Sequence, residues 1–428
     1  MERRTFLALL ALPAVAQFLT ACGDDDPPST KGRRSSLKSS AARVATGTDP
    51  TAAAAAVNAF AADLYEQLIA ADPDANLVFS PTSIAIALTM ASAGAKGQTL
   101  AEMDGVLHIT DGSAIHRSMN GLTAAFAAAN KSKDMTPEGG SGVQTVQVSI
   151  ANSLWGQLGL TFEPTFLDLL AAEYGAGMET VDYATDADGA RVSINAWVSD
   201  ATEQRIPELL SDGAITAETL LTLVNAVYLK AAWAQEFYES ATTSSTFTTS
   251  KGAAKKVPMM HRGGDLAYAT GDGWQAVELD YVFGDLGMVL AVGDTPDSVL
   301  PDGPTLFGQL SPTLVEVSLP KFDHASTISL GEILQTMGMT TPFGGSADFS
   351  GMTDDAALFI GGVVHQANIT VDEKGTEAAA ATAITLAGSA APEQPPIEVR
   401  FDRPFTYWLR EKSTNAILFI GRVNDPTG

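Results

Sequence analysis

Residue types that perform enzymatic chemistry occur in this chain, but they form no recognisable catalytic motif. The five histidines are His108, His116, His261, His324 and His365, and the only cysteine is Cys22. The sequence contains no His-Glu-x-x-His run, cysteine pair, Gly-x-Ser-x-Gly turn or glycine-rich phosphate loop. A Ser/His/Asp triad assembled only by folding leaves a hydrolase as an open alternative. The sequence therefore predicts no metal site and no cofactor.

The most informative stretch runs from Val371 to Pro396, VDEKGTEAAAATAITLAGSAAPEQPP. From Glu377 to Ala391 it has no proline and consists almost entirely of small or β-compatible residues. With the two-residue period of a strand, one face would carry Thr376, Ala378, Ala380, Thr382, Ile384 and Leu386. Pro392 would end such a strand. We expect a loop that can become a strand, although the four alanines at 378–381 also fit a surface helix or a disordered tether.

This stretch resembles the hinge of the reactive-centre loop in the serpin family. The segment Phe401–Pro426 resembles the C-terminal strands of that family. Further similar stretches follow in the family's order: Asn76–Thr99, Ser149–Trp155, Ile194–Leu210, Thr222–Phe237 and Val257–Arg262. The resemblance covers residues 51–428. It implies an α+β fold with three β-sheets, about nine helices and an exposed reactive-centre loop, and strands scattered among helices agree with that class.

The hydrophobic patterns locate the elements of this fold. Helical patterns cover residues 52–70, 83–93 and 165–174. Strand patterns cover residues 143–150, 221–228, 287–292, 314–318, 363–371, 397–401 and 416–423. The segment Lys131–Gly142 is predicted to be a loop.

The resemblance implies a serine protease inhibitor that acts as a suicide substrate. In that mechanism a protease cleaves the loop and is trapped when the freed segment inserts into the central sheet. The implied hinge residues are Glu373, Gly375, Thr376, Glu377, Ala378, Ala379, Ala380 and Ala381. Members without inhibitory activity tend to carry bulky, charged or proline residues there, whereas this hinge is small. A non-inhibitory binding or structural module at the cell surface is the alternative.

The cleaved bond can be counted from either end of the loop. A hinge of about 17 residues from Glu373, which as a strand would span roughly 55 Å, gives Ser389-Ala390. Counting back from the anchor at 398–401 gives Glu393-Gln394 instead. We prefer Ser389-Ala390, because the inserted length sets how far the protease travels. The residues around this bond are small and neutral, which favours an elastase-like or subtilisin-like protease.

Other roles also follow from the resemblance alone. A polar cluster called the shutter, where two central strands must part, would contain His365, Ser80, Ser83 and Asn195. Trp233 would lie at the breach, where the loop first inserts, and Lys321 would face Glu373. His365 and Trp233 are also plausible as ordinary core residues.

The N-terminus predicts export and lipid anchoring. Residues 1–22 have the form of a signal peptide, with Arg3-Arg4 before an apolar stretch that is too short to span a bilayer. Leu19–Cys22 resembles a bacterial lipobox, in which the Cys22 sulfur receives the lipid; an ordinary signal peptide is the alternative. Residues 23–50 are predicted to be a disordered tether before a serpin domain at 51–428. We expect attachment to a bacterial membrane, in the periplasm or at the cell surface.

The charge balance argues against polyanionic partners. The chain has 25 Lys and Arg against 50 Asp and Glu, a formal net charge of −25. Nucleic-acid binding depends on a basic surface, and no basic stretch of that kind is visible. We therefore expect no nucleic-acid partner and no heparin site, and we expect a monomer.

Overall fold

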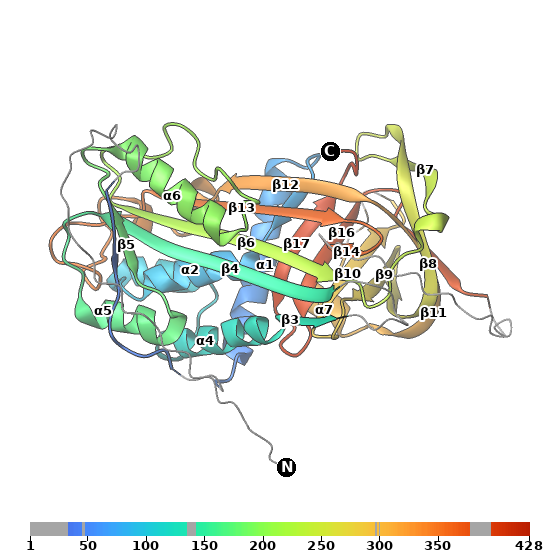
Figure 1. The fold of residues 1–428 in the computed structure, drawn as a ribbon, viewed down its shortest axis with the longest axis horizontal. Helices are drawn as coiled ribbons and strands as arrows, with labels where there is room; N and C mark the ends of the chain where they lie inside the picture. Colours follow the sequence, from blue (N-terminus) through green and yellow to red (C-terminus); the bar gives the residue numbers. More distant parts are fainter. Residues whose placement is uncertain (1–32, 45–47, 135–142, 296–297, 299, 377–394) are drawn as a thin grey trace, which may run out of the picture.

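The computed structural model describes residues 33–44, 48–134, 143–295, 298, 300–376 and 395–428 (Figure 1). These residues form two hydrogen-bonded sheets and eight α-helices. Helices lie on both faces of the first sheet, which contains β4, β6 and β13. The second sheet fills the other end of the molecule (Figure 1). The predicted α+β class is confirmed.

The first sheet has eight strands and contains the segment that leads into the loop. Its order is β1 (Arg34–Leu37), β5 (Met178–Val181), β4 (Val143–Gln157), β6 (Leu221–Ala232), β14 (Gly375–Thr376), β13 (Gly362–Val371) and β12 (Phe322–Ser329), with β3 (Lys131–Asp134) beside β4. Side chains alternate strictly along β13, so every second residue from Val363 to Val371 is buried. This period directs His365 into the core.

The second sheet has nine strands, which replace the second and third sheets expected from the sequence. Its order is β15 (Ile397–Arg400), β11 (Ser311–Pro320), β8 (Ala254–Gly271), β9 (Trp274–Asp280), β10 (Leu286–Gly293), β16 (Phe405–Glu411), β17 (Ile417–Val423) and β2 (Leu77–Phe79), with β7 (Thr243–Thr248) beside β8. The long strand β8 pairs with β7 and β11 along one part and with β9 along the other. It thereby joins two sheets into one network.

The α-helices of the described chain are α1 (Thr51–Ala71), α2 (Pro81–Ser92), α3 (Gly97–Val106), α4 (Gly112–Ala128), α5 (Pro164–Leu169), α6 (Ala187–Ala201), α7 (Gly303–Phe307) and α8 (Gly331–Thr336). A π-helical turn at Leu170–Tyr174 extends α5, and 3₁₀ turns cover Glu239–Ala241 and Thr341–Phe343. Ser80 caps α2 by accepting a hydrogen bond from the backbone N–H of Ser83, and Pro81 follows at the first helical position. Every residue of α2 is buried, as expected of a helix inside the core.

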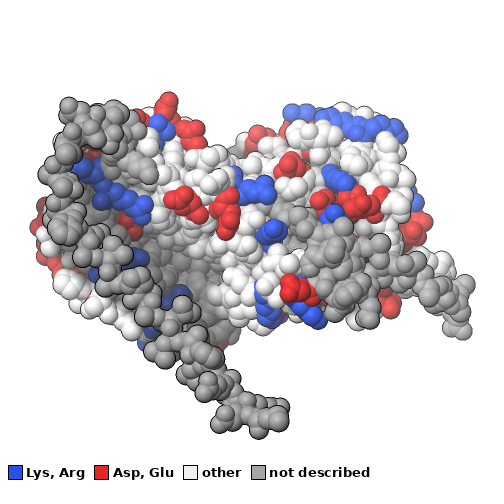
Figure 2. All heavy atoms as spheres, viewed as in Figure 1, with Lys and Arg blue, Asp and Glu red and all other residues white. Residues whose placement is uncertain are grey.

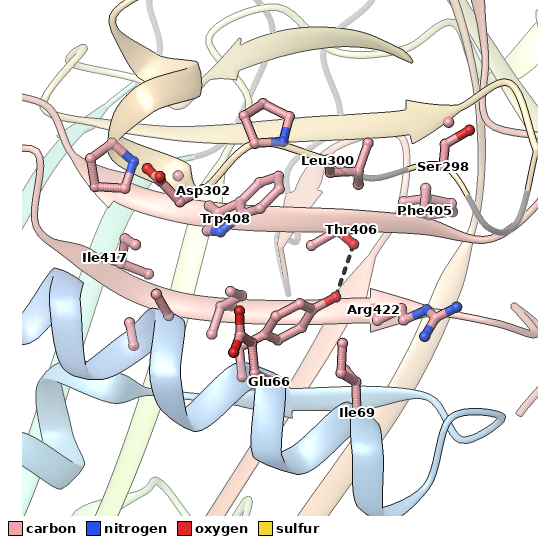
Figure 3. A pocket seen from close by; sticks show the side chains of 18 of the residues that line it. Glu66, Ile69, Ser298, Leu300, Asp302, Phe405, Thr406, Trp408, Ile417 and Arg422 are labelled. Atoms are coloured by element: carbon pink, nitrogen blue, oxygen red, sulfur yellow. Dashed lines mark hydrogen bonds between the residues drawn. The ribbon is translucent and has the colours of Figure 1, made fainter. Parts of the chain in front are cut away.

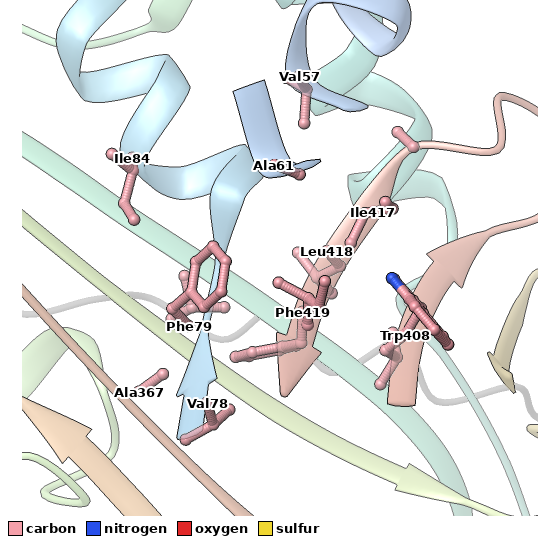
Figure 4. Close-up of a cluster of buried hydrophobic side chains, with 14 of the residues drawn as sticks. Val57, Ala61, Val78, Phe79, Ile84, Ala367, Trp408, Ile417, Leu418 and Phe419 are labelled. Carbon is pink, nitrogen blue, oxygen red and sulfur yellow. The ribbon is translucent and has the colours of Figure 1, made fainter. Parts of the chain in front are cut away.

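Two apolar clusters cover the two faces of the first sheet. On one face, Ile194 and Val198 of α6 pack with Trp155 and Val224. On the other face, α2 packs against β4 and β6 of the first sheet, and both α1 and α2 pack against β17 of the second. Figure 4 shows Phe79 of β2 together with Ile84 of α2 and Phe419 of β17 in this core. Because both faces are covered, β6 is buried along almost its whole length.

The predicted disorder of residues 23–50 is wrong for the part that the structure describes. Arg34–Leu37 pair antiparallel with β5 at the edge of the first sheet. Arg34 donates to Glu179 at 3.1 Å and lies over the Trp155 ring. Farther along, Arg43 donates to Asn120 and Thr123. A sheet edge offers unpaired backbone groups, so a polar segment can pair with it without burying apolar side chains.

A second correction concerns Lys131–Gly142, which was predicted to be a loop. Lys131–Asp134 form β3 and pair with the start of β4, and residues 135–142 lie outside the described part of the chain.

No helix among the described residues is long and apolar enough to cross a bilayer. The described residues also contain no cluster of His, Cys, Asp and Glu that could hold a metal ion.

Candidate reactive loop and hinge

The centre of the first sheet contains a seam between β6 and β13. In its lower section the two strands pair directly and in parallel, from Gly362 opposite Thr222 to Gln366 opposite Ala226. Above this section, Val227–Lys230 and Ala367–Thr370 have no ladder partner across the seam among the described residues. The seam is therefore closed below and unpaired above.

The hinge strand β14 occupies the top of this seam. Gly375 pairs with Ala232 and Thr376 with Ala231, and Thr376 also pairs with Val371 on the other side. Gly375 has φ +152°, and a Cβ at this position would lie 2.1 Å from the Ala231 carbonyl oxygen. Only glycine allows this close approach to β6. The hinge residues Gly375 and Thr376 are thus already part of the sheet.

A tight turn brings the chain from β13 into β14. The Asp372 carboxylate accepts hydrogen bonds from the backbone N–H groups of Lys374 and Gly375, at 2.8 and 3.2 Å. Trp233 fixes the turn from the neighbouring strand, because its indole N–H donates to the Asp372 carbonyl oxygen at 3.0 Å. Its backbone N–H donates to the Lys374 carbonyl oxygen. Trp233 is a core residue that also holds the hinge.

Glu373 is held in the same turn by a cation and a hydroxyl. The Lys321 ammonium lies 2.5 Å from one carboxylate oxygen, and the Thr242 hydroxyl donates to the other at 2.7 Å. Burial alone would raise the pKa of Glu373, but the hydrogen bonds from Lys321 and Thr242 outweigh it and hold the pKa below its usual value. The Glu373 side chain is only 7% exposed, against 38% for Lys321.

The inward-facing hinge side chain is Thr376. It is 2% exposed, and its hydroxyl lies 2.6 Å from the hydroxyl of Tyr281. The Tyr281 ring in turn stacks on Trp233, with ring centroids 4.4 Å apart. The breach therefore contains a small buried polar side chain, bonded to one ring of a stacked aromatic pair.

The lower section of the seam is held by His365. Its Nε2 accepts a hydrogen bond from the Ser80 backbone N–H at 3.0 Å, so its Nδ1 carries the proton and donates to Asn225. Burial lowers the pKa of His365 to about 3, which keeps the ring neutral. Ser83 bonds Ser80 through its backbone and Asn152 through its hydroxyl. This cluster joins β13, β6, β4 and the start of α2.

Asn195 does not join this cluster, which corrects the sequence-based expectation. Its side chain donates to the Leu210 carbonyl oxygen at 2.9 Å and accepts from the backbone N–H groups of Leu209 and Leu210. These bonds fasten α6 to the segment that follows it. The asparagine that contacts His365 is Asn225, on the strand across the seam.

Comparisons with known proteins agree with this architecture. The family model described as serpin (serine protease inhibitor) matches residues 55–426. The chain is 35% identical to the leukocyte elastase inhibitor of Xenopus laevis over 382 residues, covering 86% of this chain and 97% of the relative. It is 34% identical to the leukocyte elastase inhibitor of Sus scrofa, covering 87% and 99%. The chain belongs to the serpin family. The crystal structure of the thermophilic serpin tengpin in its native state superposes with a TM-score of 0.78 at 27% identity, covering 91% of this chain and 97% of that one.

Much of the serpin loop lies outside the described residues. Outside the described part are the predicted hinge residues Glu377, Ala378, Ala379, Ala380 and Ala381 and the predicted bond Ser389-Ala390. The predicted lipidation site, Cys22 near the N-terminus, also lies outside it. The description resumes at Pro395, and β15 then pairs in parallel with β11 from Ile397 onward. Thr376 thus lies at the top of the first sheet, and Ile397 lies at the edge of the second.

The surface of this serpin carries charges of both signs. On the face drawn in Figure 2, acidic and basic side chains alternate, and cationic groups gather along the upper right edge, at the end of the molecule that holds β7 and β8. Lys255 and Lys256 lie on β8, where Lys255 is paired with Asp425. The positive charge of these two lysines is small compared with the formal net charge of −25 of the whole chain.

A cavity of about 370 Å³ lies elsewhere in the serpin body, between α1, β16, β17 and the segment before α7 (Figure 3). Its lining includes Tyr65, Ile69, Trp408 and Ile417, and the Tyr65 hydroxyl bonds Thr406 at 3.0 Å. None of its lining residues belongs to the seam or to the hinge. The cavity is therefore separate from the loop-insertion site.

Three contact residues escaped prediction from the sequence. Asn225 had a signal, because it interrupts the apolar strand pattern at 221–229, and a polar residue in such a strand needs a buried partner. No sequence pattern identified Thr242 or Tyr281, since each lies in a segment between strands and contacts the hinge only in the folded serpin.

Proposed function

We propose that this serpin inhibits a serine protease by inserting its cleaved loop into the seam between β6 and β13. The observation that carries the proposal is the position of β14. Gly375 and Thr376 already pair with β6, Thr376 also pairs with β13, and the section of the seam directly below them is unpaired. The sequence after Thr376 continues with small residues that fit a strand.

The chemistry is an interrupted acyl transfer. The protease serine attacks the carbonyl carbon of the scissile residue, the amine of the next residue leaves with a proton, and an ester joins protease and inhibitor. Water would normally cleave this ester. The inserting segment instead carries the attached protease roughly 55 Å along the sheet, the length of about 17 strand residues, and distortion of the protease active site stops hydrolysis.

The unpaired section of the seam supplies the driving force. Val227–Lys230 and Ala367–Thr370 expose ladder groups toward each other, and an inserted strand would pair with both rows. The intact protein is then held in its native form by kinetics rather than by being the most stable arrangement. The shutter at His365 is the barrier at the lower end.

We assign the scissile bond to Ser389-Ala390 and the target to an elastase-like or subtilisin-like protease. No Lys or Arg occurs between Gly375 and Ile397, so a trypsin-like pocket has nothing to bind. The relatives named leukocyte elastase inhibitor support a target that accepts small or apolar residues.

We further propose that the protein is exported and attached to a bacterial membrane through a lipid on Cys22. The position of β1 in the structure supports this attachment. Arg34 pairs with Val181, and this end of β5 lies beside Gln157 of β4, at the opposite end of the sheet from β14. A tether from Cys22 would then reach the body at the pole away from the hinge.

Incubation with elastase, subtilisin and trypsin, followed by denaturing gel electrophoresis and mass spectrometry, tests the inhibitory function. We expect a covalent complex with elastase or subtilisin, none with trypsin, and a released peptide beginning at Ala390. A peptide beginning at Gln394 would move the bond to the alternative position. Cleavage without any complex would instead indicate a non-inhibitory serpin-fold module.

A further inference from the structure

Tyr281 lies at the upper end of the seam, against the hinge strand. It follows β9 directly, and its backbone forms an isolated antiparallel bridge with Trp233. The two rings stack at an interplanar angle of 15°. The phenol ring is fully buried, and its hydroxyl lies 2.6 Å from the Thr376 hydroxyl. Tyr281 therefore reaches the hinge from the second sheet.

The two hydroxyl groups satisfy each other. Within the described chain, each is the only side-chain hydrogen-bond partner of the other. Burial raises the pKa of Tyr281 far above its usual value, so the phenol keeps its proton. If Thr376 left the sheet, the Tyr281 hydroxyl would remain buried without a partner, which is unfavourable. The hydrogen bond thus favours the state in which Thr376 is in the sheet.

The position of Thr376 gives this bond its effect on the whole loop. Thr376 is the first residue after the turn that Asp372 and Gly375 hold. The backbone cannot leave the seam at Gly375 without also withdrawing Thr376, because the two residues form one short strand. A contact that fixes Thr376 therefore fixes the start of insertion.

We propose that Tyr281 is a positioning residue that keeps the first hinge residues in the sheet before any protease has cleaved the loop. The proposal rests on the loop-insertion function described above. Tyr281 touches no reacting atom and acts only through Thr376. Two effects of opposite sign follow. The intact loop is shortened and meets a protease more slowly, but after cleavage insertion starts from a formed strand and outruns hydrolysis of the ester.

The test compares Tyr281→Phe, Thr376→Val and the double variant with the parent. Tyr281→Phe keeps the ring stack and removes only the hydroxyl. Tyr65→Phe is the matched control, because it removes a phenol hydroxyl whose partner, Thr406, is not a hinge residue. Three quantities are measured: hydrogen exchange at the Gly375 and Thr376 amides of the uncleaved protein, the rate of association with elastase or subtilisin, and the number of inhibitor molecules consumed per protease inactivated.

We expect about tenfold faster exchange at the hinge amides of Tyr281→Phe, together with faster association and more inhibitor consumed. Thr376→Val should show the same pattern, and the double variant should add little to either single change, since all three remove one bond. A merely structural tyrosine would lower the thermal midpoint without accelerating association. Hinge exchange and association equal to those of Tyr65→Phe would overturn the proposal.

The exchange measurement separates this proposal from the proposed function. If the parent forms no complex with any protease, the inhibitory function fails, while hinge exchange in the uncleaved protein still decides whether Tyr281 holds Thr376. If Tyr281→Phe does not fold, Thr376→Val tests the same bond from its other end, and normal hinge exchange in that variant would contradict the proposal.

Discussion

The two ends of the seam between β6 and β13 are held in different ways. At the lower end, a neutral and fully buried His365 links Ser80 and Asn225 across directly paired strands. At the upper end, the strands are separated by β14, and the contacts include an ion pair with a partly exposed Lys321, a bond between two hydroxyls and the hydrogen bonds of Trp233 to the turn. The upper contacts involve several separate side chains, whereas the lower ones meet at the single side chain of His365. We therefore expect the seam to open from the top.

The largest expected effect comes from blocking the upper end. Thr376→Arg would place a charge in a site where the native side chain is 2% exposed, and desolvating it costs several kcal/mol. We expect the protein to change from inhibitor to substrate, with cleavage but no covalent complex on a denaturing gel. Thr376→Ser, which keeps a small hydroxyl, is the control. Undiminished complex formation by the arginine variant would contradict insertion through this site.

Removing the lower cluster should have the next largest effect. His365→Ala leaves the Ser80 N–H and the Asn225 side chain without their partner, at about 2–5 kcal/mol in total. We expect the uncleaved protein to convert much faster to loop-inserted or polymeric forms on warming, as followed by native gel electrophoresis. His108→Ala is the control, because His108 bonds Asp63 at the surface. Equal conversion of the two variants would show that His365 does not restrain the seam.

Reversing the charge at Glu373 should have a smaller effect. The Glu373 side chain is more buried than the carboxylate of a typical surface ion pair. Glu373→Lys removes its hydrogen bonds to Lys321 and Thr242 and places two cations together. We expect polymerisation on warming to accelerate about tenfold, the factor for roughly 1.4 kcal/mol in a barrier. Exchanging the charges at Glu373 and Lys321 together should restore part of the loss. If single and double variants polymerise alike, the pair does not stabilise the turn.

Acid should also weaken both ends of the seam. The folded pKa of His365 is about 3, below that of an unfolded histidine near 6.5, so the unfolded chain binds more protons between these values and stability falls as the pH drops through this window. Glu373, whose pKa is also lowered, loses its contribution as the pH falls through its folded pKa. Thermal midpoints should decrease from pH 7 toward pH 4. His365→Gln should show a shallower decrease, although His116 and His324 also have lowered pKa values and contribute.

The sequence predicts the parts of this site that follow from a local period. The alternation along 363–371 directs His365 and Val371 inward. A separate two-residue period that begins after the turn puts Thr376 on one face of the predicted strand, and its side chain is buried in the structure. The glycine that the close approach to β6 requires is also visible in the sequence, at Gly375. These features need only the two-residue period of a strand and the conformational freedom of glycine.

Contacts between distant segments were predicted less well. Asn195 and Asn225 are both asparagines in plausible positions, and only the packing of α6 against residues 209–210 decides which one meets His365. Tyr281 contacts Thr376 because the second sheet packs against the first, which no local pattern encodes. The strand at Arg34–Leu37 was missed because its stability comes from the open edge of β5, not from its own composition.

Hydrogen exchange along β6 and β13, before and after cleavage by the target protease, tests loop insertion most directly. The informative amides are those of Val227–Lys230 and Ala367–Thr370, which have no partner across the seam within the described chain. We predict that exchange slows in both segments after cleavage, while amides in the paired section at 222–226 change little. A cleaved loop with a released C-terminal peptide and unchanged exchange in both segments would contradict the account.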